Sequence, residues 1–471
     1  MTKLNRRSVL KATLASGVTA MTTGYWTGTA AAQESFDSPN EQPVVAFIGA
    51  GIRFHTAHGK GATEFGPCAA VCDVDMVQLG RAMQVVVDQH REKGHPLVIA
   101  SHEDYRHVLD RKDVDAVIIG TTDHWHTKIA IDAMKAGKDV YCEKPLTLTI
   151  REGEQIEKVQ KETGAVFQVG TQQRTEYGQR FARAVAMAHD GRVGKIKRVT
   201  AAINGSRTCD PLPVAPVPRQ LNWDMWLGQA PMTDYRQTDK VADTTGWGAG
   251  FPFGRTHRYY RWFYEYSGGK LTDWGAHHVD IAMWSMDKLK GNAGVITLTP
   301  SGVEHPVPFK NGMPQQDDRF NCATKFKVEI VFDDGMILHV RDNANDLGFG
   351  RGVMIEGDKG RYLVNRAKLV GKPVEDMKDN PLPGDALEKL YGCPVPGSHM
   401  RNFMECIKTR KTPISDVVTH NRMLDVCHAV NIAMRLNRPL KYDTAKRQFV
   451  GDAEANSFVS REQRKGYEIT T

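Results

Sequence analysis

Residues 44–54 read VVAFIGAGIRF, a short apolar run that ends in glycine, alanine and glycine. An apolar run of this length bounded by glycine is typical of a strand buried on both faces of a sheet. A glycine turn between such a strand and a helix lets backbone N–H groups approach a phosphate closely. The segment therefore predicts the first strand and turn of a dinucleotide-binding domain, in which Gly49, Gly51 and Ile52 contact the cofactor.

Further apolar runs follow this segment, at intervals that leave room for helices. They occupy residues 68–72, 114–119, 139–142 and 165–169. Buried strands that alternate with helices are typical of a doubly wound α/β domain with a parallel sheet. We therefore predict a Rossmann domain over residues 43–168.

The pattern changes after about residue 170, where longer strands alternate or meet at turns. Strands are expected at 195–202, 324–332, 336–341 and 352–355, with a hairpin turn at 333–335. Helices are expected at 179–188, 272–285, 400–409 and 421–437. These elements predict an α+β domain over residues 169–445 with a large, mostly antiparallel sheet, followed by a tail at 446–471.

Two features of this second domain bear on its role. Residues 210–260 are rich in Gly, Pro, Trp and Tyr without clear periodicity, which predicts a long ordered loop over a site. We also expect the large sheet to join copies of the chain into a homo-oligomer.

Charge and cysteine usage exclude some classes of function. The net charge is +7 over 471 residues, and the basic residues are spread thinly, so we expect no nucleic-acid partner. The eight cysteines lack the close spacing of a zinc site or a disulfide framework. We therefore expect mostly buried free thiols.

The amino terminus begins MTKLNRRSVLK, and a mildly apolar stretch then runs to the alanines at 30–32. Adjacent arginines ahead of such a stretch are typical of a twin-arginine export signal. A basic amphipathic helix or a membrane anchor is the alternative, but the stretch is too polar for a good anchor. We predict a signal peptide over residues 1–32, a polar linker over 33–42, export to the periplasm, and no membrane anchor after cleavage.

Asp73 ends the second predicted strand, where an acidic side chain accepts hydrogen bonds from the adenosine ribose. Its charge repels a 2′-phosphate, so we predict NAD rather than NADP as the cofactor. Phe54 stands where the usual fingerprint has its third glycine, which weakens the motif when it is taken alone. The alternative is a surface turn with an incidental aspartate.

The segment AGKDVYCEKP, residues 136–145, resembles the GKxVxxEKP segment of the Gfo/Idh/MocA oxidoreductase family. Residues 121–126, TTDHWH, stand where that family usually has a Thr-Pro turn followed by a histidine, with Thr122 in place of the proline. The resemblance implies that Lys144 lies beside the nicotinamide, often with a cis peptide bond between the lysine and the proline that follows it. It also implies further cofactor contacts from Thr121, His126, Glu143 and Pro145. A surface pair of Glu143 and Lys144 is the alternative.

A second segment, GGKLTDWGAHHVD at residues 268–280, is similar to the family's GGxxxDxxxHxxD stretch. On a helix, Asp273, His277 and Asp280 share one face. Asp273 is therefore expected to orient the His277 ring and to stabilise its protonated form. The resemblance implies that Lys144 and His277 are the catalytic acid/base pair, with Asp273 as their orienting residue.

A metal site is an alternative at the same place, because histidines and an aspartate gather there. The side chain of His278 points about 100° away from that of His277 on a helix, so we predict no metal. Arginine, glutamine and aromatic side chains gather in the sequence before this helix and after the last Rossmann strand, and they suit a polyhydroxylated ring with polar edges and an apolar face; packing between the domains is the alternative. The candidate substrate residues are Arg174, His257, Arg258, Arg261 and His278.

The sequence is compatible with two functions, both of which act on a small carbohydrate substrate. The first is an NAD-dependent oxidoreductase that acts on a hydroxyl carbon of a sugar, inositol or sugar acid. The second is an exported glycoside hydrolase or lyase that oxidises its substrate transiently with bound NAD and shows no net redox change. Lys144 favours the first, and export favours the second because free NAD is scarce outside the cytoplasm. A nucleotide-binding sensor is disfavoured by the presence of Lys144, Asp273 and His277.

Overall fold

The computed structural model describes residues 42–94, 98–241, 250–291 and 293–471. The predicted signal peptide, and the predicted linker up to residue 41, lie outside the described residues. Within the described ranges, no helix has the length and apolar character needed to cross a membrane. All eight cysteines lie in these ranges as free thiols, and most of them are buried.

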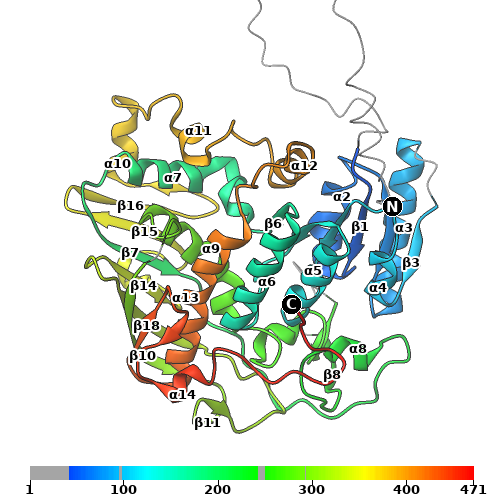
Figure 1. The fold of residues 1–471 in the computed structure, drawn as a ribbon. Coiled ribbons are helices and arrows are strands. Elements are labelled where there is room, and N and C mark those ends of the chain that lie inside the picture. The colour runs from blue at the N-terminus through cyan, green and yellow to red at the C-terminus, as the bar shows by residue number, and fades with distance from the viewer. Residues whose placement is uncertain (1–41, 95–97, 242–249, 292) are drawn as a thin grey trace, which may run out of the picture. The chain divides into compact units, whose positions relative to one another are not determined.

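The first half of the folded chain contains a six-stranded parallel sheet in the order β3-β2-β1-β4-β5-β6 (Figure 1). The strands are β1 (Val45–Ile48), β2 (Cys68–Cys72), β3 (Ala100–His102), β4 (Ala116–Ile119), β5 (Asp139–Cys142) and β6 (Phe167–Val169). The connecting helices are η1 (Phe54–His58), α2 (Gly59–Gly61), α3 (Met76–Lys93), α4 (Tyr105–Leu109), α5 (Asp123–Lys135) and α6 (Ile150–Thr163). The predicted doubly wound sheet is confirmed, with one strand beyond those predicted, because β3 is a short Ala-Ser-His segment without an apolar run.

The second half contains a nine-stranded sheet in the order β17-β16-β15-β7-β14-β13-β10-β18-β19. The pair β7 and β14 is parallel, and the other neighbours are antiparallel. The strands are β7 (Ile196–Ala202), β10 (Val295–Glu304), β13 (Lys325–Val331), β14 (Ile337–Arg341), β15 (Gly352–Gly357), β16 (Gly360–Val364), β17 (Leu369–Val370), β18 (Leu440–Asp443) and β19 (Gln448–Phe449). The predicted hairpin at 333–335 joins β13 to β14.

Helices α9 and α13 connect this sheet to the Rossmann half. Figure 1 shows them between the large sheet and α6, and α13 contacts α9, α6 and β10. Most residues of α13 are therefore buried, and its buried side chains are distributed around the helix rather than along one face. The helical segments of this half are η2 (Gln172–Arg174), η3 (Tyr177–Gln179), α7 (Arg180–His189), α8 (Trp223–Leu227), η4 (Tyr259–Trp262), α9 (Gly269–Ser285), η5 (Asn345–Leu347), α10 (Lys372–Glu375), η6 (Asp376–Lys378), α11 (Ala386–Tyr391), α12 (His399–Thr409), α13 (Val417–Leu436) and α14 (Ala453–Asn456).

The predicted long loop before α9 has an aromatic core of its own and is tied to α5. Its described part includes α8, η4 and the small strands β8 (Gln237–Val241) and β9 (Pro252–Gly254). Trp226 packs among Tyr260 and Tyr266 in a buried cluster. The Trp125 indole donates to the Trp226 carbonyl at 3.1 Å, and Tyr260 donates to Asp123 at 2.6 Å. These bonds hold the loop over the carboxyl end of β4.

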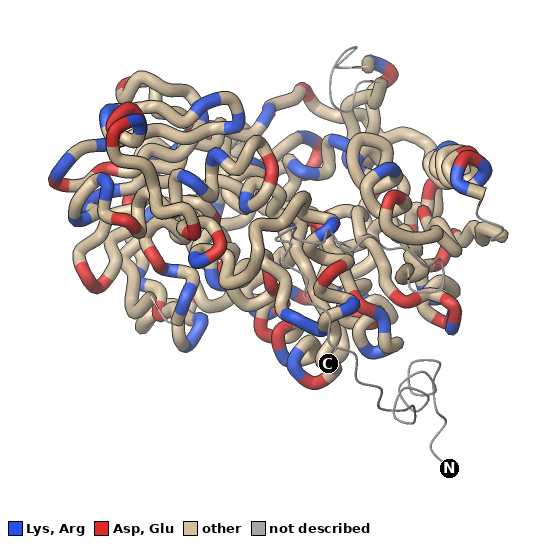
Figure 2. The backbone as a smooth tube through the Cα atoms, turned by 90° about the horizontal axis from the view of Figure 1, so that it is seen from above, with Lys and Arg blue, Asp and Glu red and all other residues tan. Residues whose placement is uncertain are grey.

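The segment 446–471, predicted as a tail, returns to the Rossmann half. It contributes β19 to the large sheet and then passes α5, where the Tyr467 ring lies 5.7 Å from the Trp125 ring. Ile469 near its end is buried. Figure 2 shows Lys and Arg interspersed with Asp and Glu along the described backbone.

Candidate active site

A cavity of about 1080 Å³ lies at the carboxyl ends of the Rossmann strands and reaches helix α9 of the second domain. The ends of β1, β2, β4 and β5 supply its first wall. This is the edge at which open parallel sheets bind their ligands. All the predicted cofactor residues except Pro145 line it, namely Gly49, Gly51, Ile52, Asp73, Thr121, His126, Glu143 and Lys144.

The glycine turn after β1 fits a phosphate-binding role. Gly49 has a φ of +92°, and a Cβ there would lie 2.6 Å from the Gly120 backbone, so no other residue fits without strain. A Cβ at Gly51 would meet nothing within 4 Å, because this residue faces the cavity. The turn is held by Asp73, whose carboxylate accepts from the Ala50 N–H at 2.7 Å. Burial raises the pKa of Asp73 to about 6.

Phe54, in place of the third glycine, changes the helix that follows the turn. This helix begins as the π-helical turn η1, and the Phe54 ring packs edge-on against Phe47 at 4.9 Å. A Cβ at Gly59 would lie 2.9 Å from the Phe54 ring, so Gly59 makes the room that Phe54 needs. The close packing of helix and strand is kept by a glycine one helical turn later.

Lys144 is held at the first turn of α9. The peptide bond between Lys144 and Pro145 is cis. The Lys144 ammonium donates to the Asp273 carboxylate at 2.5 Å and to the Asp273 carbonyl at 2.9 Å. Burial alone would raise the pKa of Asp273, but the charges of Lys144, Lys270 and Arg261 outweigh it and lower that pKa. The site therefore contains an ionised carboxylate bonded to an ammonium group.

Glu143 and His126 fix the backbone around Lys144. The Glu143 carboxylate accepts from Arg53 and Gln172, both at 2.8 Å. The His126 ring nitrogens lie 2.7 Å from the Pro145 carbonyl oxygen and 3.2 Å from the Thr121 carbonyl oxygen. His126 thus ties the Pro145 turn to the end of β4.

His277 lines the cavity one helical turn after Asp273. Asp273 is bonded to Lys144, and Nδ1 of His277 is buried without a hydrogen-bond partner among the described residues. Burial, with the positive charges of Lys144 and Arg366, lowers the pKa of His277 well below its ordinary value. The charge of Asp273 acts in the expected direction and raises the pKa of His277, but burial and the positive charges outweigh it, and the imidazole is neutral. Among the described contacts, the Asp273 carboxylate bonds to Lys144 and not to the His277 ring, so the expected orienting role stays a prediction.

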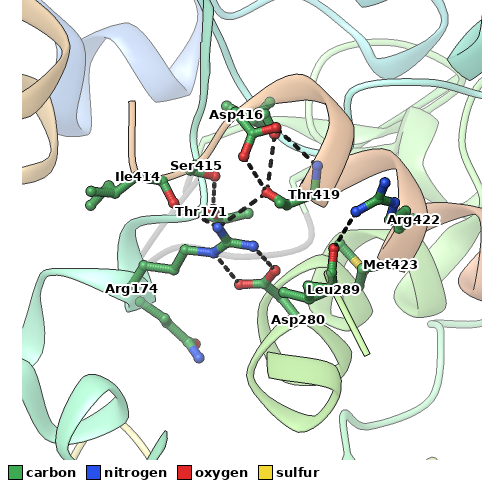
Figure 3. Close-up of polar contacts among 12 residues, drawn as sticks. Thr171, Arg174, Asp280, Leu289, Ile414, Ser415, Asp416, Thr419, Arg422 and Met423 are labelled. Atoms are coloured by element: carbon green, nitrogen blue, oxygen red, sulfur yellow. Dashed lines mark hydrogen bonds and ion pairs between the residues drawn. The ribbon is translucent and has the colours of Figure 1, made fainter. Parts of the chain in front are cut away.

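Arg174 and His278 do not line the cavity, which corrects their predicted contact with substrate. Arg174 is buried and donates to Asp280 at 2.9 and 2.6 Å and to the Ile414 carbonyl at 2.6 Å (Figure 3). The His278 ring is buried against Phe181, away from the cavity. Turn η2 directs Arg174 into the interior, and the helical repeat directs His278 toward Phe181 of α7.

The other three predicted substrate residues line the cavity at two places. His257 Nε2 lies 2.9 Å from Asp75, the residue that caps α3, so His257 stands at the end of β2. Arg258 and Arg261 line the wall formed by η4. Among the described residues, no three His, Cys, Asp or Glu side chains are placed to hold a metal ion.

Family models match most of the chain. Residues 44–171 match the oxidoreductase family's NAD-binding Rossmann fold, and residues 206–469 match its C-terminal alpha/beta domain. The chain belongs to the Gfo/Idh/MocA oxidoreductase family. Its cofactor is NAD, for which the glycine turn, Asp73 and the cavity are suited.

Curated relatives match part of this chain. A glycosyl hydrolase family 109 protein of Shewanella sp. (strain MR-4) and an alpha-N-acetylgalactosaminidase of Shewanella oneidensis are each 34% identical over 164 residues. Each match covers 34% of this chain, and the chain spans 34% of the relative's length.

Solved structures share the fold. The WlbA dehydrogenase from Bordetella pertussis, in complex with NADH and UDP-GlcNAcA, has a TM-score of 0.55 and 16% identity, over 84% of this chain and 98% of that one. A levoglucosan dehydrogenase, in complex with NADH and levoglucosan, has a TM-score of 0.53 and 19% identity, over 87% of this chain and 98% of that one.

In this Gfo/Idh/MocA protein, the second domain adds cavity residues that the sequence did not indicate. Arg351 and Arg366 line the cavity, and both guanidinium groups lie over the ring of Trp274, at 3.9 and 4.5 Å from its centroid. Arg366 also lies 4.7 Å from the Tyr177 ring. Each arginine stands alone in the sequence, on a different strand connection, so no spacing or motif could have revealed that they meet.

Proposed function

We propose that this protein is an NAD-dependent oxidoreductase that transfers a hydride between a hydroxyl carbon of a sugar, inositol or sugar acid and tightly bound NAD. The observation that carries this proposal is the Lys144–Asp273 ion pair beside the neutral His277, on the cavity wall that faces the glycine turn. When bound, the nicotinamide accepts or returns the hydride. The residues of the chain then have to hold and move a proton.

The two basic groups divide this work. In the direction of oxidation, the hydroxyl proton passes to the neutral imidazole of His277, whose lowered pKa leaves a nitrogen lone pair available at neutral pH. Lys144 donates a hydrogen bond to the same substrate oxygen and stabilises the negative charge that develops on it. Asp273 positions the Lys144 ammonium through a 2.5 Å bond.

The 34% identity to glycosyl hydrolase family 109 proteins supports a second candidate, a redox-neutral glycosidase. In that reaction the same site oxidises one sugar carbon to a ketone, which acidifies the neighbouring C–H bond. Loss of that proton expels the glycosidic oxygen, water adds to the resulting alkene, and the ketone is reduced again. Both candidates share the first oxidation and the same roles for Lys144 and His277.

One experiment separates the two candidates. The purified protein is incubated with free sugars and with aryl glycosides, including one of N-acetylgalactosamine, while absorbance reports reduced nicotinamide and released phenol. Accumulation of reduced nicotinamide without phenol supports the oxidoreductase. Phenol release without net reduction supports the glycosidase, and the absence of both signals across the sugar panel contradicts both.

We also propose that the protein is exported in folded form to the periplasm, on the basis of Arg6 and Arg7 ahead of a weakly apolar stretch. A protein that is exported in folded form can carry tightly bound NAD with it, which suits a compartment poor in free nucleotide. Replacing both arginines with lysine should leave precursor in the cytoplasm, as cell fractionation would detect. Normal export of that variant would contradict the twin-arginine assignment.

A further inference from the structure

Arg351 and Arg366 come to one place because their strands are neighbours. Arg351 immediately precedes β15 and Arg366 follows β16, and these strands pair with Val353 opposite Val364. Both guanidinium groups therefore emerge at the same end of the sheet, over Trp274 of α9. Trp274 follows Asp273, the residue that binds Lys144, so the two arginines border the proposed reaction centre.

The two arginines differ from several charged groups of the same cavity, which form ion pairs: Arg53 with Glu143, Lys144 with Asp273, and His257 with Asp75. Neither Arg351 nor Arg366 forms an ion pair with a carboxylate that the structure describes; Arg366 donates only to the neutral Gln173, at 3.2 Å. Two cations on one aromatic ring repel each other unless an anion joins them.

The stacked arrangement suits ligand binding better than packing alone. A guanidinium group that stacks on an aromatic ring uses its flat face for that contact. Its N–H donors point outward in the guanidinium plane and stay free to bind a ligand. Those donors match a planar carboxylate or the oxygens of a phosphate in a bidentate manner. Both arginines line the cavity, so these donors are accessible to a bound molecule.

We propose that Arg351 and Arg366 bind an anionic substituent of the substrate, either the carboxylate of a sugar acid or a phosphate or sulfate ester on a sugar. This rests on the proposed function, because it places the reacting hydroxyl at Lys144 and His277. The Trp274 and His277 rings lie 5.8 Å apart, so the anionic substituent and the reacting carbon belong to one monosaccharide unit. The Trp274 ring, over which both guanidinium groups lie, orients the anion site relative to Asp273 and His277 of α9.

The test compares charged and neutral sugars on the NAD-loaded protein. The charged probes are D-glucuronate, D-galacturonate, D-gluconate, glucose 6-phosphate and glucose 6-sulfate. Their neutral counterparts are glucose, galactose and sorbitol. Calorimetry measures binding, and absorbance measures reduction of bound NAD. We expect at least one charged probe to bind about 10- to 100-fold more tightly than its neutral counterpart, the range of a charge-assisted bidentate contact. Whether the carboxylates or the esters bind identifies the anion.

The variants tie this preference to the two arginines. Arg351→Gln/Arg366→Gln should remove the preference for the charged probe, and Arg366→Lys should keep part of it. Arg361→Gln is the matched control, because Arg361 is exposed on the same sheet and does not line the cavity. It should keep the full preference. If the double variant fails to fold, the two single variants supply the same comparison.

Three results would overturn the proposal: no charged probe preferred by the wild type, a preference that survives in the double variant, or loss of NAD from the double variant with the sugar preference intact. The last result would assign the arginines to the cofactor. Arginine-dependent binding of a charged sugar without reduction of NAD would support the anion site and contradict the oxidoreductase, so the two proposals fail separately.

Discussion

The cavity residues at positions 48–144, here the cofactor wall, come mostly from short contiguous segments that follow Rossmann strands. The cavity residues at positions 172–400, the second-domain wall, come from many separate segments: η2, η3, α8, η4, α9, the start of α12, and the connections around β15 and β16. The charges also differ. The cofactor wall pairs its charges internally, as Arg53 does with Glu143, whereas Arg351 and Arg366 face the cavity without a described counterion.

This difference follows from what each wall has to bind. NAD has one shape, so the contacts to it can be fixed by a turn and by hydrogen bonds within the wall, such as that of Asp73 to Ala50. In a substrate site assembled from separate strand connections, one residue can be replaced without disturbing the glycine turn that binds NAD. The Lys144–Asp273 pair, which we propose to serve in proton handling, joins the two walls, and its loss should have the largest effect.

Replacing Lys144 or His277 with alanine should lower kcat by about 10² to 10⁴, the usual contribution of a positioned acid or base. The NAD content of either variant should hardly change, because the turn and Asp73 remain. Single-turnover reduction of bound NAD by a C-deuterated substrate, across a pH series, measures the effect. The double variant should lose less than the product of the two single losses, since both groups act on the same hydroxyl of the substrate.

His278→Gln is the matched control, since it lies on the same helix and does not line the cavity. It should leave kcat within about twofold of the wild type. If His277→Ala keeps the wild-type rate and pH profile, the proton-transfer role is excluded.

Arg174→Ala tests whether Arg174 stabilises the fold and does not contact the substrate. Removing one partner of a buried ion pair leaves an uncompensated charge and typically costs about 3–5 kcal/mol. We expect that loss in the free energy of unfolding in urea, because Asp280 is fully buried beside Arg174. The KM should stay within about threefold of the wild type at temperatures where the variant is folded. A rise in KM without loss of stability would return Arg174 to the substrate site.

The sequence predicted the cofactor wall better than the second-domain wall for a physical reason. A strand, a glycine turn and an acidic residue at the next strand end are local features, so Gly49, Gly51 and Asp73 could be found by spacing alone. The spacing in residues 268–280 correctly placed Asp273 and His277 on one helix, but it could not say which group each would meet. Asp273 meets Lys144 and Asp280 meets Arg174, and both contacts depend on how α9 packs.

The same limit explains the remaining differences from the sequence prediction. Strand β3 was missed because its three residues are polar or small and only partly buried, so no apolar pattern marks it. Arg351 and Arg366 were missed because they become neighbours only when β15 pairs with β16. Where a site is assembled from distant strands, residue type alone does not distinguish a ligand contact from a surface charge.

Alanine at Gly49 and at Gly51 should separate folding from cofactor binding on the cofactor wall. Gly49→Ala places a Cβ 2.6 Å from the Gly120 backbone at a positive φ, and it should lower the free energy of unfolding by about 3 kcal/mol. Gly51→Ala meets no protein atom within 4 Å, so the cofactor-free protein should change by less than about 0.5 kcal/mol. Its NAD affinity should nevertheless fall at least tenfold, because the Cβ enters the space left for the phosphates. Equal NAD binding by Gly51→Ala and wild type in calorimetry would place the pyrophosphate elsewhere.

Asp73→Asn should have the smallest effect, and it tests whether the carboxylate reads the ribose as well as holding the turn. The amide oxygen can still accept the Ala50 N–H, although it cannot replace the second oxygen that accepts the Asp75 N–H. The glycine turn should therefore persist, while the preference for NAD over NADP should fall by about tenfold with the lost charge. The pH dependence gives a second readout in the cofactor-free protein. Because burial raises the pKa of Asp73 to about 6, the folded state binds its proton more tightly than the unfolded chain. The stability contributed by this proton is therefore complete below about pH 4 and is lost as the pH rises through about 6. Urea unfolding between pH 4 and 7 should show that slope in the wild type and a flatter profile in Asp73→Asn. An unchanged NADP preference would mean that Asp73 serves the turn alone, and an unchanged slope would contradict the raised pKa.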